Sequence, residues 1–257
     1  SQPKEIQIHQ LREQLQLLLL KIISDKKYFK NIAFLGGTAL RICHNLQRYS
    51  EDLDFSLIEN KGYDFLDILH KITKELEHYG LQTDIKYKTG TVDNAYIRFP
   101  NILQQAGLTD ISSQKLSIKL EIDTNPPQGY SVEKQLINNT FIFPLLVFDL
   151  PSLFAGKLHA ILYRKFIKGR DRYDLVRYLS NRIIPNFTLL QYSEKQTGIT
   201  SLTTNTQELK QKILNKLKTT SKKTLLNDVG VFLMHPSERE LLSLENIKNL
   251  VEKTVSS

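Results

Sequence analysis

Cysteine is almost absent from this chain of 257 residues. Cys43 is the only one, so no disulfide can form within the chain, and this fits a protein of the reducing cytoplasm. No second histidine or cysteine stands at ligand spacing from His44, His159 or His235, which argues against a zinc site. We therefore expect a cytoplasmic protein that needs neither disulfides nor zinc.

A long hydrophobic run is also missing. The apolar cluster at residues 15–23 is shorter than the roughly 20 residues that cross a bilayer, and Arg12, Lys21 and Lys26 stand close to it. No small-residue cleavage site follows the cluster, so it is not a secretory signal. Since residues 5–24 place apolar side chains near the helical period, we expect a buried helix face and no membrane partner.

Acidic charge is in deficit. Lys and Arg number 35 against 27 Asp and Glu, and the formal charge of +8 favours a polyanionic partner such as RNA or a nucleotide. Part of the excess is a run near the C-terminus, made of Lys210, Lys212, Lys216, Lys218, Lys222 and Lys223. Such a run is either the solvent-exposed face of a helix or a surface that contacts the phosphates of a long nucleic-acid acceptor. Few aromatic residues interleave with it, so it does not predict a platform for unpaired bases.

The order of apolar segments predicts a mixed α/β (α+β) fold. Short apolar or alternating runs mark the expected strands, at residues 32–35, 53–57, 83–88, 95–99, 116–123 and 141–148. The helical period marks the expected helices, at residues 5–24, 39–46, 65–80, 151–167, 207–217 and 237–251. Because strands give way to helices near Leu150, we predict a mixed domain at residues 1–149 and a helical domain at residues 150–257.

The most informative segment joins a glycine turn to a pair of carboxylates. Gly36 and Gly37 end an apolar strand, and Thr38 is expected to cap the following helix. Glycines there let backbone N–H groups approach phosphate oxygens, although Gly-Gly also occurs as a plain turn. Asp52 and Asp54 alternate along the next strand, so their side chains share a face. Such a pair fits Mg²⁺ (or Mn²⁺), whose other ligands are water and the phosphates of a nucleoside triphosphate.

A third carboxylate is available on another strand. Residues 116–123 alternate between apolar and polar, with Lys119, Glu121 and Asp123 on the polar side. Glu121 and Asp123 therefore point to the same face, and spacing alone leaves open which of them joins a metal site.

Basic residues gather where the helical part begins. Lys157, Arg164 and Lys168 follow one stripe of the expected helix, which suits the charge of a triphosphate. Gly169 is expected to end that helix in the left-handed conformation, and Asp171 to cap the next one. Lys168 near a helix C-terminus and Asp171 near a helix N-terminus would each interact favourably with the helix dipole, and Arg164 could simply be a solvent-exposed cation. These charges therefore also fit a turn between two helices that binds no ligand.

Together these motifs resemble the AbiEii/AbiGii toxin family of the DNA polymerase β-like nucleotidyltransferase superfamily. The resemblance runs in order from about residue 31 to residue 179. It is carried by Gly36-Gly37-Thr38-Ala39-Leu40-Arg41, Arg48-x-Ser50-x-Asp52-Leu53-Asp54-Phe55, Lys119-Leu120-Glu121-Ile122, Lys157-Leu158-His159-Ala160 and Lys168-Gly169-Arg170-Asp171-x-Tyr173-Asp174-Leu175. The Gly-Gly and Asp-x-Asp segments are common to the superfamily, whereas the last corner is more particular to the family.

The resemblance implies a nucleotidyltransferase-fold mixed sheet with flanking helices and a helical C-terminal domain, with the nucleotide in the cleft between them. It also implies the toxin of a bacterial toxin–antitoxin or phage-defence pair, with an antitoxin protein as partner. Such a toxin would transfer a nucleoside monophosphate to an acceptor hydroxyl, for example the 3′ end of tRNA.

The resemblance further implies residue roles. Asp52, Asp54 and, in preference to Asp123, Glu121 would bind the metal ions, and Lys157 would neutralise the triphosphate. The other expected nucleotide contacts are Gly36, Gly37, Thr38, Arg48, Ser50, Arg164 and Lys168, with Ser50 serving either a phosphate or a local cap. Asp171 would orient Lys157 or the acceptor hydroxyl, or act as a general base. Asp174 is expected to brace Arg170 or Arg172.

Two other functions fit the same fold. One is the same chemistry on a hydroxyl of a protein or a small molecule. The other is a non-catalytic module that binds RNA or a partner protein.

Overall fold

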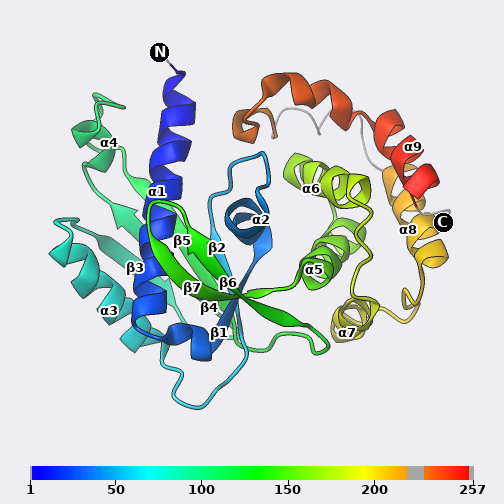
Figure 1. The fold of residues 1–257 in the computed structure, drawn as a ribbon, viewed down its shortest axis with the longest axis horizontal. Coiled ribbons are helices and arrows are strands. Elements are labelled where there is room, and N and C mark those ends of the chain that lie inside the picture. The colour runs from blue at the N-terminus through cyan, green and yellow to red at the C-terminus, as the bar shows by residue number, and fades with distance from the viewer. Residues whose placement is uncertain (1, 219–228, 255–257) are drawn as a thin grey trace. The chain divides into compact units, whose positions relative to one another are not determined.

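The computed structural model describes residues 2–218 and 229–254 (Figure 1). Contacts divide the chain into two compact units. The sheet unit comprises residues 1–45, 49–126 and 132–147, and the helical unit comprises residues 46–48, 127–131 and 148–257. A mixed sheet with flanking helices and a helical C-terminal part confirm the predicted fold class.

The sheet unit is built on seven strands in the order β3-β4-β5-β2-β1-β7-β6. Their bounds are β1 Ile32–Leu35, β2 Leu53–Leu57, β3 Asp84–Lys88, β4 Val92–Phe99, β5 Leu116–Asp123, β6 Val132–Asn138 and β7 Ile142–Phe148. β2 runs antiparallel to β1 and parallel to β5, and β4 runs antiparallel to both β5 and β3. Parallel pairs also join β1 to β7, so the sheet is mixed.

One edge of the sheet differs from the sequence prediction. β6 was not predicted, because Glu133, Lys134 and Gln135 interrupt the apolar alternation that marks a half-buried strand. It forms the edge, where polar side chains meet solvent, and β7 lies inside it despite Pro144.

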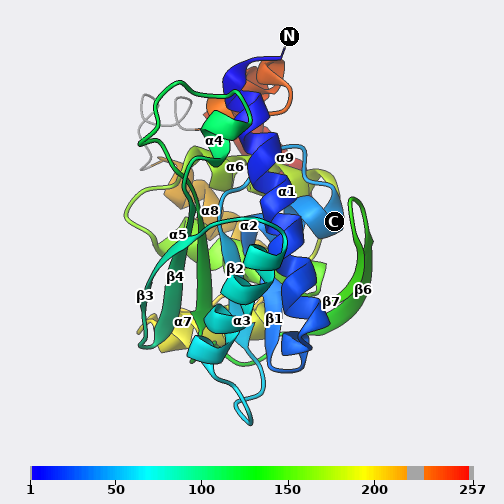
Figure 2. The same cartoon turned by 90° about the vertical axis from the view of Figure 1, so that its left-hand side faces the viewer.

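Helices cover one face of this sheet. α1 (Lys4–Asp25) and α3 (Phe65–His78) pack against each other, and Figure 2 shows them side by side in front of the strands. Ala95, Ile97 and Leu120 are fully buried on the covered face. Shorter elements complete the unit: α2 Gly36–His44, α4 Ile102–Gln105 and the 3₁₀ turn η1 Tyr28–Lys30. Because the odd and even positions of each strand face opposite ways, the polar positions of β4 and β5 are left on the other face.

The helical unit is organised around α5. Its elements are α5 Leu150–Tyr163, α6 Gly169–Ser180, α7 Phe187–Gln196, α8 Thr206–Lys218, α9 Leu244–Thr254 and the 3₁₀ turns η2 Gly230–Phe232 and η3 Pro236–Leu242. α5 packs against α6, α7 and α8, while α9 packs against α6 and α8. Pro151 lies in the first turn of α5 as predicted, and Asp149 caps it by accepting a hydrogen bond from the Ser152 N–H. The predicted helix at residues 237–251 is instead η3 followed by α9.

The helix that carries Lys157 is shorter than its apolar period predicts. Backbone at Arg164 is extended, so α5 ends there. Lys216 Nζ donates to the Arg164 carbonyl at 2.6 Å, a carbonyl that would accept a backbone hydrogen bond if the helix continued. Ile167, beyond the end of the helix, is buried in the core. The predicted stripe of three cations on one helix is therefore wrong.

The start of α6 corrects two further predictions. Lys168 is the N-cap of this helix and Gly169 its first residue, so Gly169 does not end the preceding helix in a left-handed conformation. Asp171 is the third residue inside α6 rather than its cap. Both errors follow from the early end of α5, which shifts the corner by several residues.

Among residues 2–218 and 229–254, no helix is both long enough and apolar enough to cross a membrane.

Candidate active site

The candidate carboxylates lie at the start of β2, beside the turn that follows β1. Leu35 is the register partner of Asp54, so the next residue, Gly36, comes directly against the carboxylate. Gly36 has φ +84°, and a Cβ at this position would overlap an Asp54 carboxylate oxygen and stand 3.0 Å from its Cγ. Only glycine fits both the conformation and the space, so the glycine turn and the acid form one structure.

Thr38 joins the same structure without capping the helix. α2 begins at Gly36 and its N-cap is Leu35, so the predicted cap at Thr38 is wrong. Instead the buried Thr38 hydroxyl donates to the backbone carbonyl of Asp52. This bond fastens the first turn of α2 to the residue that precedes β2.

β5 brings a further carboxylate to Asp54. Glu121 and Asp54 are register partners on neighbouring parallel strands, so their side chains share a face at a strand spacing of about 4.8 Å. Asp123 is paired with Ser56 and accepts a hydrogen bond from the Asn125 N–H at 3.0 Å. The register therefore favours Glu121 over Asp123 as the neighbour of the acidic pair.

Lys119 holds Glu121 in place. Its Nζ lies 2.7 Å from Glu121 Oε1. Burial would lower the pKa of Lys119, but the bond to Glu121 and the nearby Tyr96 and Asp52 raise it, so the ammonium stays charged among the acids. This pairing was not predicted, although the two-residue spacing of Lys119 and Glu121 on one strand is a signal for it.

Asp52 and Asp54 fit a divalent cation by their chemistry, since carboxylate oxygens are the donors that Mg²⁺ takes. Within residues 2–218 and 229–254, no three His, Cys, Asp or Glu side chains are placed to hold a metal ion together. Two protein carboxylates agree with the usual Mg²⁺ shell, which water and substrate phosphates complete. Glu121, bonded to Lys119, stays a predicted third ligand.

A second cluster of charges lies in the helical unit around Asp174, which is fully buried. Arg48 Nε and Nη2 donate to its two oxygens at 2.7 Å each, and Lys157 Nζ stands 2.8 Å away. Burial would raise the pKa of Asp174, but these two cations outweigh it and lower the pKa to about 2. Asp174 was predicted to brace Arg170 or Arg172, whereas the contacts described here join it to Arg48 and Lys157.

Lys157 is held by two carboxylates. Its Nζ lies 2.8 Å from Asp171 Oδ1 as well as from Asp174. Burial would lower the pKa of Lys157, whereas both acids raise it, so the side chain remains an ammonium. Arg164 Nη1 stands 3.5 Å from the other oxygen of Asp171. Of the roles left open for Asp171, its contacts support the orientation of Lys157.

The other predicted nucleotide contacts differ in exposure. Arg48 is 2% exposed and forms the bidentate pair with Asp174, while Arg164 and Lys168 are exposed. Ser50 is partly buried, and its carbonyl accepts a hydrogen bond from Gln16 at 3.2 Å. It stays a prediction that these residues contact the nucleotide. It also stays a prediction that the nucleotide binds between the two domains.

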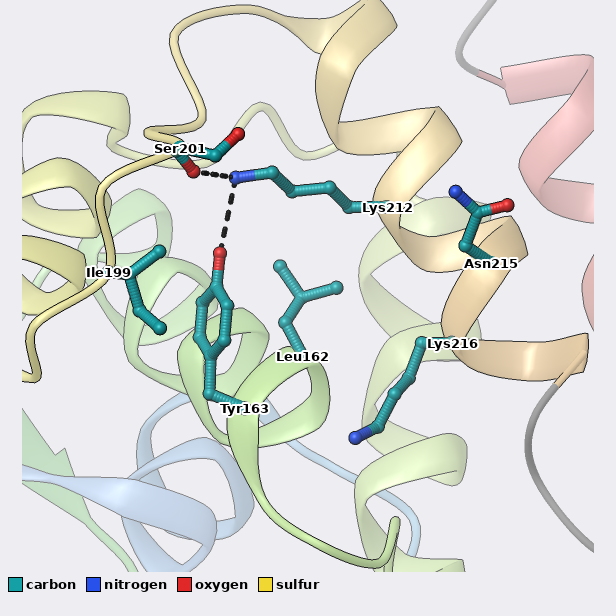
Figure 3. Close-up of a pocket in the computed structure, with 7 residues that line it drawn as sticks. All are labelled: Leu162, Tyr163, Ile199, Ser201, Lys212, Asn215 and Lys216. Atoms are coloured by element: carbon teal, nitrogen blue, oxygen red, sulfur yellow. Dashed lines mark hydrogen bonds between the residues drawn. The ribbon is translucent and has the colours of Figure 1, made fainter.

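A pocket of about 350 Å³ opens in the helical unit (Figure 3). It is lined by Leu162, Tyr163, Ile199, Ser201, Lys212, Asn215 and Lys216. Lys212 Nζ donates to the Tyr163 hydroxyl at 3.2 Å and to the Ser201 carbonyl at 2.5 Å, and it lies 3.2 Å from the buried Glu194. Lys212 is therefore held by contacts within the helical unit and stabilises the fold.

The lysine run near the C-terminus has a similar structural use. Lys210 Nζ donates to the carbonyl of Glu252 at 3.0 Å, and Lys216 Nζ donates to that of Arg164. Lys222 and Lys223 lie outside the described residues. The described contacts thus favour packing of the helical unit over the alternative role in phosphate binding.

A glycine turn packed against an Asp-x-Asp strand, on a mixed sheet with flanking helices, defines a nucleotidyltransferase-fold protein. The chain belongs to the family of AbiEii nucleotidyl transferase toxins of type IV toxin–antitoxin systems, because the family model matches residues 17–243. This confirms the resemblance in the sequence.

Two solved structures from Helicobacter pylori share the fold. JHP933 is 19% identical, with a TM-score of 0.54 over 96% of this chain and 93% of its own. A protein proposed to be a nucleotidyltransferase is 22% identical, with a TM-score of 0.54 over 95% of this chain and 94% of its own. At these identities the likeness shows the fold. No curated protein matches the chain.

Proposed function

We propose that this protein transfers a nucleoside monophosphate from a nucleoside triphosphate to an acceptor hydroxyl and depends on Mg²⁺ or Mn²⁺. The observation that carries the proposal is the contact of Gly36 with Asp54, with Glu121 in register beside it. This arrangement brings the start of α2 to the acids, and helix starts favour phosphate groups. A triphosphate and its metal ions would thus find their ligands in adjacent segments.

The chemistry is a phosphoryl substitution. The acceptor oxygen forms a bond to the α-phosphorus, and the bond between the α-phosphorus and the oxygen that bridges it to the β-phosphate breaks. Pyrophosphate leaves, and the proton of the acceptor hydroxyl passes to a base. Asp52 and Asp54 would hold the cation, which when bound stabilises the attacking and leaving oxygens. Lys157 would offer its ammonium to phosphate oxygens, with Asp171 and Asp174 fixing its direction.

We propose RNA as the acceptor, with the 3′ end of tRNA as the first candidate, and an antitoxin protein as the partner. The net charge of +8 supports a polyanionic acceptor. Membership in a family of type IV toxins supports the antitoxin.

The test is a transfer assay with each of the four α-labelled nucleoside triphosphates, total RNA, and either Mg²⁺ or Mn²⁺. We expect label in the RNA fraction, and its loss on chelation of the metal. Label in protein or small molecules without labelled RNA would overturn the proposed acceptor. If no nucleotide transfers under any of these conditions, the non-catalytic alternative replaces the enzyme.

Gly36→Ala provides a sharper probe of the glycine turn. We expect transfer to fall by at least 100-fold, because the new Cβ displaces the Asp54 carboxylate. The left-handed conformation also costs roughly 1–2 kcal/mol of stability in any residue with a Cβ. Transfer rate and urea unfolding separate these two effects.

Gly80→Ala is the matched control. Gly80 has φ +74° and no atom within 4 Å of a Cβ position, so it carries the conformational cost without the collision. It should lose a similar amount of stability and keep its activity. Equal activity of the two variants would show that the position of the Asp54 carboxylate is not critical.

A further inference from the structure

The face of the sheet opposite α1 and α3 carries a row of polar side chains that ends at the candidate acids. Lys88 of β3 is paired with Asn94 of β4, Asn94 with Glu121 of β5, and Glu121 with Asp54 of β2. Register partners point to the same face, so these four side chains form one row across four strands. Three strand spacings separate its ends, about 14 Å. The row therefore leads from Asp54 to the outer edge strand.

A second row runs beside the first. Lys86 of β3 is paired with Tyr96 of β4, and Tyr96 with Lys119 of β5. Tyr96 is 41% exposed, and Lys119 Nζ lies 5.8 Å from the centre of its ring. Lys86 and Lys88 are exposed at the edge. An open aromatic ring thus stands between cations, one row from the acids.

Three other cations near this face are paired with carboxylates. Arg98 Nη1 and Lys115 Nζ each lie 3.5 Å from the same carboxylate oxygen of Asp84. Lys119 is bonded to Glu121, as described above. The cations left to meet a ligand at the edge are thus Lys86 and Lys88, next to Tyr96.

An exposed aromatic ring next to lysines, as on this face, can bind both the bases and the phosphates of single-stranded RNA. Unpaired bases stack on exposed aromatic rings, and lysines contact the phosphates between them. The lysine run at residues 210–223 lacks interleaved aromatics, whereas the sheet face combines both elements with continuity to Asp54.

We propose that the β3–β4–β5 face, defined by Lys86, Lys88, Asn94 and Tyr96, binds the single-stranded end of an RNA acceptor. A base stacks on Tyr96, Lys86 and Lys88 contact phosphates, and the row through Asn94 directs the strand toward Asp54. This inference rests on the proposed function, since it names the surface that would present the acceptor to the transferase.

The test measures binding of a fluorescent ten-nucleotide single-stranded RNA by anisotropy, without nucleoside triphosphate. Stacking of one base contributes roughly 1–3 kcal/mol, so Tyr96→Ala should weaken binding roughly 5- to 150-fold. The double variant Lys86→Gln/Lys88→Gln should reduce the salt dependence, the slope of log K against log salt, by about 1.4. Circular dichroism checks that both variants are folded.

Tyr192→Ala is the matched control. Tyr192 is 42% exposed, and Lys195 Nζ lies 5.6 Å from its ring centre, which reproduces the local setting of Tyr96 on a helix. It should bind RNA like the wild type. Unchanged binding by Tyr96→Ala, equal loss in Tyr192→Ala, or no RNA binding by the wild type would each overturn the inference. If RNA is labelled while Tyr96→Ala binds normally, the inference fails and the proposed function stands.

Discussion

Asp54→Asn should strongly reduce nucleotide transfer while leaving the fold intact. The amide keeps the shape of the side chain beside Gly36 but removes the charge that would hold the cation. Charge stabilisation by a bound metal contributes several kcal/mol to the transition state, and each 1.36 kcal/mol is a factor of ten. We expect the transfer rate to fall about a thousandfold, measured by single-turnover kinetics at saturating nucleotide.

The matched control for Asp54 is Asp123→Asn on the neighbouring strand. Asp123 is paired with Ser56 and accepts the Asn125 N–H, a bond that an asparagine side chain can also accept. It should keep wild-type activity, whereas Glu121→Gln should lose activity if Glu121 is the third ligand. The opposite result, with Asp123→Asn inactive and Glu121→Gln active, would reverse the assignment drawn from the register.

Asp174→Ala should strongly destabilise the helical unit. Arg48 and Lys157 would then keep buried positive charges without the carboxylate that compensates them. Removing one partner of a buried ion pair costs about 3–5 kcal/mol. We expect a loss of this size in the free energy of unfolding, measured in urea at pH 7.

The effect should depend on pH in a defined direction. The pKa of Asp174 falls from its ordinary 3.8 to about 2 in the folded protein. Its stabilising effect is therefore complete above about pH 4 and is lost as the pH falls toward 2, so the difference between wild type and Asp174→Ala should shrink over that window.

Asp84→Ala is the control for Asp174. Asp84 also faces two cations, but at 3.5 Å and with a side chain 44% exposed. Exposed pairs contribute about 0–1 kcal/mol. Equal losses for the two variants would contradict a special role of the buried cluster.

The sequence was sufficient to predict the elements that position the acids. Local alternation marks β2 and β5, and Asp54 lies on β2 as predicted. Asp52 comes directly before β2, so the shared face of the two acids stays a prediction. Spacing alone left the neighbour of Asp54 open between Glu121 and Asp123, and only the family resemblance favoured Glu121. Register depends on the pairing of distant strands, which no local pattern records.

The helical unit was harder to predict because its decisive contacts are long-range. Arg48 and Asp174 lie 126 positions apart in the chain, so the prediction for Asp174 considered only nearby arginines. The early end of α5 likewise depends on Lys216, which belongs to α8. The helical period of residues 151–167 depends only on which side chains are apolar. It therefore predicts neither the partner of Asp174 nor the residue at which α5 ends.

Binding of Mn²⁺, followed by electron paramagnetic resonance in the presence of a non-hydrolysable nucleoside triphosphate, tests most directly whether the acids at the start of β2 hold the cation. We predict that wild type and Asp123→Asn bind Mn²⁺ with similar affinity and that Asp52→Asn and Asp54→Asn each bind at least tenfold more weakly. Equal affinity in all four proteins would contradict the account.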